Sequence, residues 1–521
     1  MTNKWTPILP LTWVDCYKVD HRRQYAEGTT RVLSNYTNRG SRIDDIHHVV
    51  HFGLQAFLVK WSAAWEPFFE AEEDEVAALY EEFVTAVIGP NQVGSDHIRA
   101  LHQLGYLPLR FCGLPEGTLV PLRVPSFTVE NTIPEFFWLT NYIESVLSAS
   151  YWQPSTSATL AHQFRQLLNR WALKTTGSID GVEFQGHDFS FRGMPGEEAA
   201  AASGAGHLLS FLGSDALNVI PWVADNYSGL DNGMILGSVP ATEHSVATSY
   251  GREGDQAYFE HLLDIYPSGI VSAVSDSYDL WETLTVTLPA LKERIMARDG
   301  KLVIRPDSGD PVNIVTGTVK WREGTPRVYD RTSDEYIPAP EDYQFEPAQK
   351  GVVELLWDEF GGTVNEQGYK VLDPHLGVIY GDAITYERAE KIMERLAAKG
   401  FASTNIVFGV GSYIYQYKTR DTFGSAIKAT WIEENGVGKD IYKDPITDNG
   451  TKKSARGRVA VIRDSDPGEG TVGDLVLFDG ESGAAIERAG ESLLQPVWKD
   501  GQFVQYQSYQ NVREVLAGEF W

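Results

Sequence analysis

Cysteine is nearly absent from this chain of 521 residues, which contains only Cys16 and Cys112. Two cysteines cannot build a disulfide framework, so we expect a protein of a reducing compartment, the cytoplasm. Long hydrophobic runs are also missing: no stretch approaches the roughly 18 uncharged apolar residues that a membrane span needs. The chain begins MTNKWTPILPLTWVDCYK, which has neither a long apolar core nor a small-residue cleavage site, and this predicts no signal peptide.

Basic residues are scarce relative to acidic ones: 44 Lys and Arg stand against 71 Asp and Glu, for a net charge of −27. A surface of this sign repels the phosphates of nucleic acids and anionic lipids, so we expect neither a nucleic-acid partner nor a membrane partner. An anionic substrate would need a local cluster of Arg and Lys that outweighs the global field. With 42% hydrophobic and 22% charged residues, the composition is that of a globular protein and excludes wholesale disorder.

From about residue 180 the sequence alternates short apolar runs, each ending in polar residues, with helix-like stretches. Four successive runs end about 30 residues apart, at Asp215, His244, Asp276 and Asp307. That interval is the length of one βα unit in a parallel barrel. We therefore predict an α/β fold with an irregular parallel (β/α) barrel over residues 151–424.

The rhythm is interrupted between Asp307 and Asp382, where a polar stretch at 316–350 has no helical period. We interpret this part as an insertion in the barrel, near residues 316–366. The chain then ends in alternating, strand-like pieces. These pieces predict that residues 1–150 and 425–521 together form a second, discontinuous α+β domain.

The ends of the predicted strands carry a chemically coherent set of side chains. In a parallel barrel these ends converge on one rim. Arg holds phosphates through forked donors, carboxylates hold Mg²⁺ or ribose hydroxyls, and glycine-rich turns present backbone N–H groups to a phosphate. The set consists of Phe189, Arg192, Asp215, His244, Asp276, Arg305, Asp307, Gly381, Asp382 and Gly409.

Each of these motifs also has a plainer interpretation. Asp307 lies in RPDSGDP, which is ordinary turn chemistry, but the apolar run before it and the neighbouring Arg305 favour a site. His244 could be a structural hydrogen-bond donor, yet among carboxylates at a barrel rim an imidazole is a candidate nucleophile towards a phosphoryl group. Gly409 and Gly411 could be packing devices after a strand.

Basic segments outside the predicted barrel are harder to assign. The run KKSARGR at 452–458 is unusual in so acidic a chain, and it is either an anion-binding loop or a solvated loop with counter-charges elsewhere. Near the start of the chain, DCYKVDH at 15–21 and NRGSR at 38–42 combine aromatic and basic residues. From residue chemistry alone, these two segments are best interpreted as an ordinary turn and a solvated loop.

In their order along the chain, the motifs resemble those of the nicotinamide phosphoribosyltransferases, which belong to the type II phosphoribosyltransferase family. The matching segments are DCYKVDH at 15–21, FTVENTIPE at 127–135, WLTNYIE at 138–144, HDFSFRG at 187–193, GSD at 213–215, SVPATEHS at 238–245, VSDSYD at 274–279, IRPDSGDP at 304–311, GD at 381–382, TRD at 419–421 and KDP at 443–445. The resemblance implies that nicotinamide attacks C1 of 5-phosphoribosyl-1-pyrophosphate, giving nicotinamide mononucleotide and pyrophosphate in NAD biosynthesis. It also implies a homodimer with active sites at the interface.

The resemblance further implies how the substrates are held. Phe189 and, from the other subunit, Tyr17 would sandwich the pyridine ring. Asp215 would accept a hydrogen bond from the carboxamide N–H, and Arg305 would donate one to the carboxamide carbonyl. The 5′-phosphate would be held by Gly381, Asp382, Gly409 and Gly411.

Catalysis is assigned to His244, Asp276 and Asp307 by the same resemblance. Asp307 would bind the ribose, and Asp276 with Asp307 would place Mg²⁺. His244 would be phosphorylated by ATP, coupling ATP hydrolysis to product formation. Pyrophosphate would be held by Arg192, Arg305 and His244 together with Arg39, Arg420, Lys428 and Lys443 of the partner subunit.

Three other functions stay open at this point. A nicotinate phosphoribosyltransferase is disfavoured by Asp215, whose carboxylate would face that of nicotinate with like charge. A glycoside hydrolase would suit the 14 Trp and the acidic composition, but it needs two carboxyl groups across a sugar cleft and has little use for the Arg and Lys set. A binding protein without activity is disfavoured because His244, Asp276, Arg305 and Asp307 are all present.

Overall fold

The computed structural model describes residues 3–228, 234–322, 324–330, 332–447, 453–464 and 474–518. The chain divides into two compact units, each assembled from separate segments. The terminal unit consists of Met1–Thr159, Pro221–Gly233 and Lys418–Trp521. The central unit consists of Leu160–Ile220 and Met234–Tyr417.

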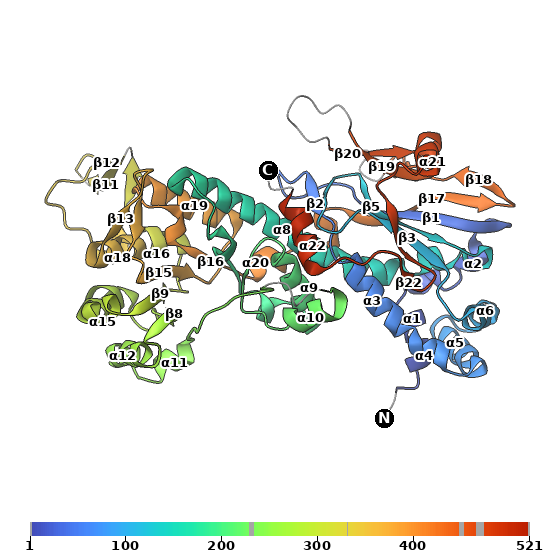
Figure 1. Cartoon of the computed structure of the whole chain (residues 1–521), viewed down its shortest axis with the longest axis horizontal. Coiled ribbons are helices and arrows are strands. Elements are labelled where there is room, and N and C mark those ends of the chain that lie inside the picture. Colours follow the sequence, from blue (N-terminus) through green and yellow to red (C-terminus); the bar gives the residue numbers. More distant parts are fainter. Residues whose placement is uncertain are drawn as a thin grey trace. The chain divides into compact units, whose positions relative to one another are not determined.

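A curled parallel sheet forms the centre of the central unit (Figure 1), which confirms the α/β class predicted from the sequence. Its strands, in spatial order, are β7 (Gly213–Ser214), β6 (Gly186–Asp188), β16 (Val407–Val410), β15 (Leu376–Tyr380), β9 (Asp299–Arg305) and β8 (Ser268–Val274). Both edge strands also bridge to the segment 237–241: Gly213 pairs with Gly237, and Ser272 pairs with Ala241. The apolar run before His244, which the period predicted as a strand, therefore forms isolated bridges rather than a regular strand.

Helices alternate with these strands, as the period of about 30 residues predicted. The clearest is α19 (Tyr386–Ala398), which buries Ile392 and Leu396 and begins where the hydroxyl of Thr385 accepts a hydrogen bond from the amide of Arg388. The other helices of this unit include α9 (Glu197–His207), α11 (His244–Thr248), α12 (Asp255–Ile265), α15 (Lys292–Met296), α16 (Pro311–Thr316), α18 (Val352–Phe360) and α20 (Ser412–Tyr415).

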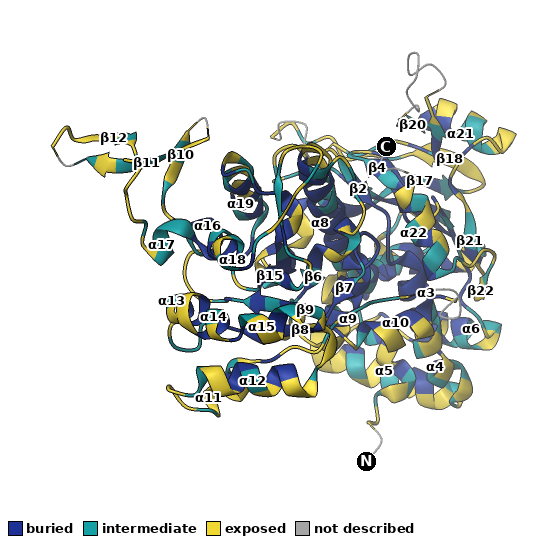
Figure 2. Ribbon diagram, turned by 60° about the vertical axis from the view of Figure 1, so that its left-hand side comes forward, coloured by how far each residue is buried: buried dark blue, intermediate teal, exposed yellow. Residues whose placement is uncertain are grey.

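The polar stretch at 316–350 folds into an antiparallel sheet of three strands, β10 (Lys320–Arg322), β11 (Thr325–Asp330) and β12 (Glu335–Pro338). No residue of these strands is buried (Figure 2), which explains why the sequence shows no alternation there. Helix α18 follows and buries Val352, Val353 and Leu356. Helix α18 therefore interrupts the predicted insertion, and exposed residues follow it again in β13 (Gly362–Val364).

Segments from both ends of the chain form one antiparallel sheet in the terminal unit (Figure 1). Its strands, in spatial order, are β18 (Val437–Asp440), β17 (Ser425–Glu434), β1 (Thr29–Asn38), β5 (Pro125–Asn131), β3 (Leu109–Gly113), β21 (Gln495–Lys499) and β22 (Gln502–Phe503). The helices of this unit include α3 (Leu54–Ala64), α5 (Glu73–Ile88), α6 (Asp96–Leu104), α21 (Gly480–Ala489) and α22 (Tyr509–Ala517). Trp61, Trp65 and Trp498 are buried together in its core.

Helix α8 (Glu144–Thr176) has 33 residues and contributes its first part to the terminal unit and its last part to the central unit. Pro154 lies inside this helix, where a proline removes one backbone hydrogen bond. Among the described residues, no helix is both long enough and apolar enough to cross a membrane.

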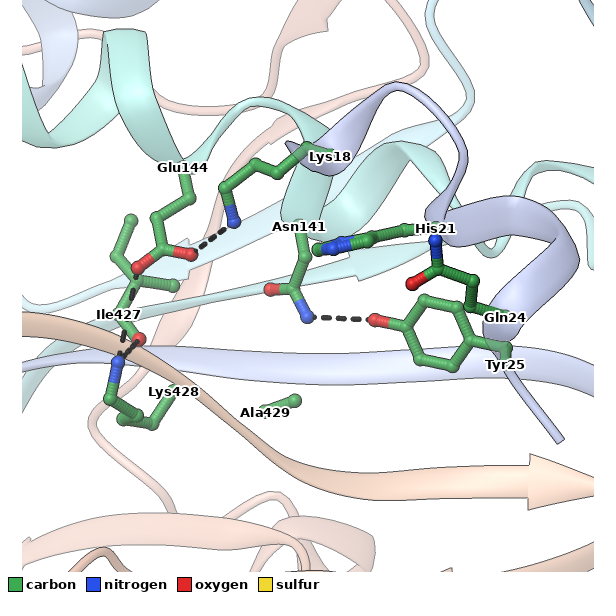
Figure 3. Close-up of a pocket in the computed structure, with 9 residues that line it drawn as sticks. All are labelled: Lys18, His21, Gln24, Tyr25, Asn141, Glu144, Ile427, Lys428 and Ala429. Atoms are coloured by element: carbon green, nitrogen blue, oxygen red, sulfur yellow. Dashed lines mark hydrogen bonds and ion pairs between the residues drawn. The ribbon is translucent and has the colours of Figure 1, made fainter. Parts of the chain in front are cut away.

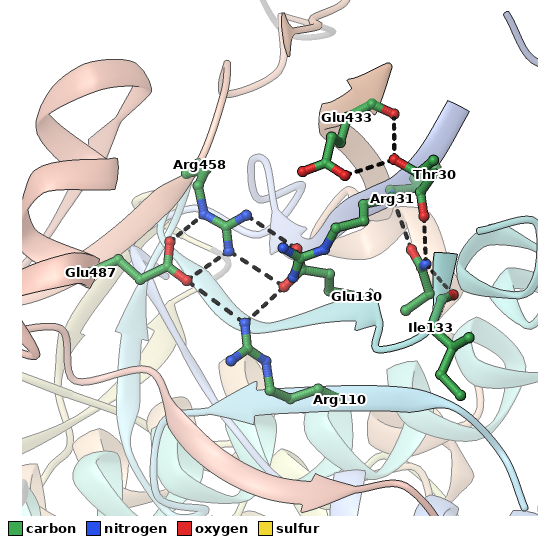
Figure 4. A network of polar contacts seen from close by, with 10 residues as sticks. Thr30, Arg31, Arg110, Glu130, Ile133, Glu433, Arg458 and Glu487 are labelled. Atoms are coloured by element: carbon green, nitrogen blue, oxygen red, sulfur yellow. Dashed lines mark hydrogen bonds and ion pairs between the residues drawn. The ribbon is translucent and has the colours of Figure 1, made fainter. Parts of the chain in front are cut away.

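A buried carboxylate on β5 holds together three arginines of the terminal unit (Figure 4). The side chain of Glu130 is only 2% exposed and lies 2.7 Å from Arg31, 2.7 Å from Arg110 and 3.1 Å from Arg458. Arg458 also forms two hydrogen bonds with Glu487 on α21, at 2.5 and 2.7 Å. Burial opposes ionisation, but the charge of Arg458 and its two neighbours holds the pKa of Glu130 below its usual value.

This network decides between the two interpretations of the basic run at 452–458. Arg458 is turned inward and neutralised, so it is a structural residue rather than an anion-binding one. Arg456 lies 3.8 Å from Asp440 and is paired as well. Lys452 lies outside the described residues.

Replacing Glu130 by Gln is expected to lower the free energy of unfolding by about 2–3 kcal/mol, since three arginines then lose their shared counter-charge. Urea unfolding followed by circular dichroism measures the change. The matched control is Glu82→Gln, because Glu82 pairs with Lys4 where both side chains are more than half exposed. The control is expected to change stability by less than about 0.5 kcal/mol. Equal effects of the two substitutions would contradict the role given to Glu130.

Candidate active site

A histidine and two carboxylates meet beyond the carboxyl ends of β8 and β9. The Nε2 atom of His244 lies 3.0 Å from Oδ1 of Asp307 and 4.0 Å from Oδ1 of Asp276. Because an ionised carboxylate only accepts hydrogen bonds, Nε2 carries the proton and donates it to Asp307. The hydroxyl of Ser277 then donates to Nδ1 of His244 at 2.9 Å. The carboxylate thus orients the imidazole and leaves Nδ1 as the nitrogen with a lone pair.

Asp276 fixes the loop that carries Asp307. Its Oδ2 atom accepts hydrogen bonds from the amide of Asp307 at 2.9 Å, from the amide of Ser308 at 2.8 Å and from the hydroxyl of Ser308 at 2.5 Å. The side chain is 3% exposed, and among the described residues its Oδ1 atom has no hydrogen-bond partner. An unsatisfied buried carboxylate oxygen beside a second carboxylate is a donor set that suits a hard cation.

The ligand atoms of His244, Asp276 and Asp307 all lie within 4.8 Å of one another, close enough to hold one metal ion. Asp276 and Asp307 were predicted as Mg²⁺ ligands, and the arrangement fits that prediction, because one oxygen of each carboxylate belongs to this group of close ligand atoms. The His244 imidazole is the third member of this group, but its Nε2 atom, which faces the two carboxylates, carries a proton here and does not ligate a metal in this state.

Phe189 lies on a floor made by two glycines at the ends of β15 and β16. A Cβ atom on Gly409 would come within 2.4 Å of the Phe189 ring, and one on Gly381 would come within 3.2 Å of it. The backbone amide of Phe189 donates to the carbonyl of Val410 at 2.9 Å, which holds the residue over β16. Both glycines therefore have a packing role here, and their predicted contact with a 5′-phosphate stays a prediction.

Asp215, directly after β7, is held by two donors. Nε2 of His187 lies 3.0 Å from its Oδ1 atom, and the hydroxyl of Ser238 donates to the same atom at 2.5 Å. Burial raises the pKa of Asp215, but these hydrogen bonds and the charge of Arg305 hold it below its ordinary value. Arg305 itself donates to the carbonyl oxygen of Thr242 at 2.7 Å. Asp215 is therefore an ionised carboxylate with a fixed orientation.

Tyr380 connects Asp382 to the histidine cluster. Its hydroxyl donates to the carbonyl oxygens of Ser308 and Gly309 at 3.0 and 3.1 Å. Burial raises the pKa of Tyr380, and the carboxylates of Asp382 and Asp276 raise it further. The loop after β9 is thus tied to the end of β15.

Most site residues predicted in the central unit are therefore linked by direct contacts or by their electrostatic influence on a common neighbour: Phe189, Asp215, His244, Asp276, Arg305, Asp307, Gly381, Asp382 and Gly409. Arg192 is not linked to them: it is exposed, and within the described part of the chain its side chain has no hydrogen bond or ion pair. Gly411 faces open space, since a Cβ atom added there would meet nothing within 4 Å.

The terminal unit holds the remaining predicted residues. A pocket of about 380 Å³ (Figure 3) is lined by Lys18, His21, Gln24, Tyr25, Asn141, Glu144, Ile427, Lys428 and Ala429. Beside it, the Tyr17 ring is 64% exposed and lies 5.5 Å from the ring of His21. Lys18, only 4% exposed, pairs with Glu144 at 2.6 Å, and Lys428 lies 3.9 Å from the same carboxylate.

Of the cations predicted to act from the partner subunit, Lys428 lines this pocket, and Arg39 and Lys443 lie within its electrostatic reach. Burial lowers the pKa of Lys428, Glu144 opposes that shift, and the charges of Arg39, Lys18 and Lys443 lower the pKa further. In a chain of net charge −27, this crowding of like charge favours an anionic ligand. Arg420 is exposed and pairs with its neighbour Asp421 at 3.2 Å.

Comparison with known proteins identifies the family. The sequence is 46% identical to the nicotinamide phosphoribosyltransferase of Acinetobacter baylyi, over 98% of this chain and 97% of that protein. The chain belongs to the nicotinamide phosphoribosyltransferase family. It is also 35% identical to the nicotinamide phosphoribosyltransferase of Mycoplasma pneumoniae, over 87% of this chain and 96% of that one. The resemblance inferred from the motifs is confirmed.

Family models agree with this assignment. The model of the nicotinate phosphoribosyltransferase (NAPRTase) family matches residues 184–501, and the model of the nicotinamide phosphoribosyltransferase N-terminal domain matches residues 10–110. Among solved structures, this member of the nicotinamide phosphoribosyltransferase family is similar to the nicotinate-nucleotide pyrophosphorylase of Pyrococcus furiosus, with a TM-score of 0.51 and 16% identity over 100% of this chain and 97% of that one. Human nicotinic acid phosphoribosyltransferase is similar as well, with a TM-score of 0.51 and 15% identity over 96% of this chain and 92% of that one. At these identities the likeness shows the fold alone.

The residues of this family member's site that were not predicted from the sequence include His187 and Ser238, the donors to Asp215. His187 had a usable signal, because residues two apart on a strand point to the same face and His187 precedes Phe189 by two. The rings of His187 and Phe189 indeed lie 5.0 Å apart. Ser238 had no comparable signal, since it follows no regular strand.

Proposed function

We propose that the chain transfers the phosphoribosyl group of 5-phosphoribosyl-1-pyrophosphate to nicotinamide, forming nicotinamide mononucleotide and pyrophosphate in NAD biosynthesis. The observation that carries this proposal is the ionised, oriented carboxylate of Asp215 within the electrostatic reach of Arg305, in the same sheet-end cluster as the aromatic ring of Phe189. A flat ring with a carboxamide matches these groups: the ring stacks, the amide N–H donates to a carboxylate, and the carbonyl accepts from a guanidinium. The A. baylyi and M. pneumoniae relatives carry the name of this activity.

Substrate choice follows from the charge of Asp215. Its Oδ1 atom is already occupied by His187 and Ser238, which leaves Oδ2 to accept the carboxamide N–H. Nicotinate would bring a second carboxylate to this oxygen, and the two like charges would repel each other. Tyr17 of a second copy of the chain would cover the other face of the pyridine ring, for which its exposed ring is suited.

The chemical step places the pyridine nitrogen against C1 of the ribose while the bond from C1 to pyrophosphate breaks. The nitrogen lone pair forms the new bond, and the electron pair of the old bond leaves with pyrophosphate. Asp307 stabilises the positive charge that develops on the ribose, and positioning supplies much of the rate. Gly381, Asp382, Gly409 and Gly411 would hold the 5′-phosphate.

The leaving pyrophosphate needs positive charge. Within this chain we assign that role to Arg192, Arg305 and His244, and within a second copy to Arg39, Arg420, Lys428 and Lys443. Asp276 and Asp307 would hold Mg²⁺ through the oxygens described above; when bound, the ion neutralises charge on the pyrophosphate. A homodimer with shared sites, acting in the cytoplasm, is part of this proposal.

A competition assay tests the proposed function. The purified chain receives phosphoribosyl pyrophosphate with equal amounts of nicotinamide and nicotinate, with and without ATP, and both mononucleotides are measured by mass spectrometry. We expect nicotinamide mononucleotide as the main product. Predominant nicotinate mononucleotide would instead establish the second candidate, a nicotinate phosphoribosyltransferase, which the family model matching residues 184–501 favours. Absence of both products would reject a pyridine phosphoribosyltransferase.

We further propose that ATP phosphorylates His244 and thereby stimulates the reaction. Nδ1 of His244 attacks the γ-phosphorus of ATP, and ADP leaves with the electron pair of the broken bond. The phosphohistidine is then hydrolysed. His244→Ala is expected to abolish stimulation by ATP and to leave residual synthesis without ATP. The matched control is His261→Ala, an exposed histidine on α12, which is expected to keep full stimulation. Full stimulation in His244→Ala would remove the phosphohistidine from the mechanism.

A further inference from the structure

The two oxygens of the Asp215 carboxylate have unequal surroundings. Nε2 of His187 and the hydroxyl of Ser238 both approach Oδ1, at 3.0 and 2.5 Å. Across the described residues, Oδ2 has no hydrogen-bond partner. A carboxylate held by two donors on one oxygen cannot exchange its oxygens freely, so its second oxygen keeps a constant direction.

His187 is itself held firmly. It lies on β6, where it pairs with Gly409 on one side and with Gly213 on the other. A Cβ atom at position 213 would come within 2.7 Å of Nδ1 of His187, so glycine there leaves the space that the imidazole occupies. The Phe189 ring meets the imidazole at an angle of 60°. The imidazole therefore contacts both the carboxylate and the aromatic ring assigned to nicotinamide.

Resting on the proposed function, we propose that His187 is the positioning residue for nicotinamide: it donates Nε2–H to Oδ1 of Asp215 and so directs Oδ2 to the carboxamide. His187 acts through Asp215 and does not take part in bond breaking. Without this donor only Ser238 holds Oδ1, so the carboxylate is less restrained and the carboxamide loses an acceptor at a fixed place. The hydrogen bond from His187 also helps to hold the pKa of Asp215 below its ordinary value, which keeps the carboxylate charged.

Two substitutions separate the hydrogen bond from the bulk of the ring. His187→Phe keeps an aromatic ring against Phe189 but removes the donor. His187→Gln places an amide N–H near the position of Nε2 and keeps the donor. We expect His187→Phe to raise the KM for nicotinamide about tenfold, the effect of one hydrogen bond to a charged group, with kcat within about threefold. His187→Gln is expected to stay within about threefold of the unmodified chain in both constants.

Two readouts distinguish positioning from a structural role. His187→Phe is expected to lower the preference for nicotinamide over nicotinate about tenfold and to leave the KM for phosphoribosyl pyrophosphate unchanged. An unchanged nicotinamide KM and preference, or an equal rise of both KM values, would overturn the proposal. If His187→Phe does not fold, His187→Asn, whose shorter amide does not reach Oδ1, takes its place with the same expectations. Failure of the unmodified chain to form nicotinamide mononucleotide would reject the proposed function instead.

Discussion

Asp307→Asn is expected to lower kcat/KM for phosphoribosyl pyrophosphate about 1,000-fold, equivalent to about 4 kcal/mol of transition-state stabilisation. The substitution removes the negative charge that faces the developing positive charge on the ribose. It also weakens the hydrogen bond that the side chain accepts from Nε2 of His244, 3.0 Å away, because an amide oxygen carries no charge. The loop itself is kept, because Asp276 binds the backbone amide of residue 307 rather than its side chain. Steady-state kinetics at saturating nicotinamide measures the loss.

A control in the same loop isolates the position of the charge. Asp310→Asn makes the same chemical change three residues on. Asp310 accepts a hydrogen bond from the amide of Asn313 at 2.8 Å and caps α16, and asparagine caps a helix equally well. Asp310→Asn is expected to retain kcat/KM within about threefold. Comparable losses in both variants would show that net charge, not the carboxylate of Asp307, matters.

Asp215→Asn is expected to have the second large effect, on substrate choice. The ratio of kcat/KM for nicotinamide to that for nicotinate should fall at least about 100-fold, because the repulsion of nicotinate disappears and the new amide N–H can donate to its carboxylate. Competition between the two bases, read by mass spectrometry, gives the ratio. The control Asp264→Asn removes an exposed carboxylate paired with Arg294 and should leave the ratio unchanged. An unchanged ratio in Asp215→Asn would refute the charge argument.

The pH dependence of the same ratio follows from the lowered pKa of Asp215. A carboxylate loses its charge only as the pH falls through its pKa. With the pKa held below the ordinary value of about 3.9, Asp215 stays ionised throughout the range from pH 8 to pH 6. The unmodified chain should therefore keep a constant preference for nicotinamide over this range. A preference that falls between pH 8 and pH 6 would show that Asp215 is not the group that excludes nicotinate.

The sequence predicted the three longest strands of the central sheet. The apolar runs at 270–274, 302–304 and 378–380 lie within β8, β9 and β15, each of which buries at least two apolar residues. Strands β6 and β7 have only three and two residues and leave no such run. The apolar residues 208–212, interpreted as a strand, instead follow the end of α9.

The strands of the insertion were missed for a different physical reason. Strands β10, β11 and β12 have no buried face, so their sequences do not alternate between apolar and polar residues. They are stabilised by contacts across the strands, such as the rings of Tyr329 and Tyr336 at 5.4 Å. Which residues form such pairs is decided by the register of the two strands in the hairpin. A hydrophobic pattern within one strand does not reveal it.

One rule, that polar residues after parallel strands face the same edge of the sheet, predicted which side chains would meet. That rule placed His244, Asp276 and Asp307 together. It could not find the hydrogen-bond partners that orient them, because Ser277 and Ser308 are unremarkable in sequence and act only through the folded loop.

The glycine floor under Phe189 sets the height at which a flat ring can rest. Even one methyl group on Gly409 would lift the ring, because the present separation leaves no room for it. The Phe189 ring already rests on glycine backbone and cannot move further down. The space for an aromatic base between Phe189 and a second ring is therefore fixed on this side by the two glycines. A smaller side chain in place of Phe189 would make room for larger bases, whereas a side chain at Gly381 or Gly409 would take room away.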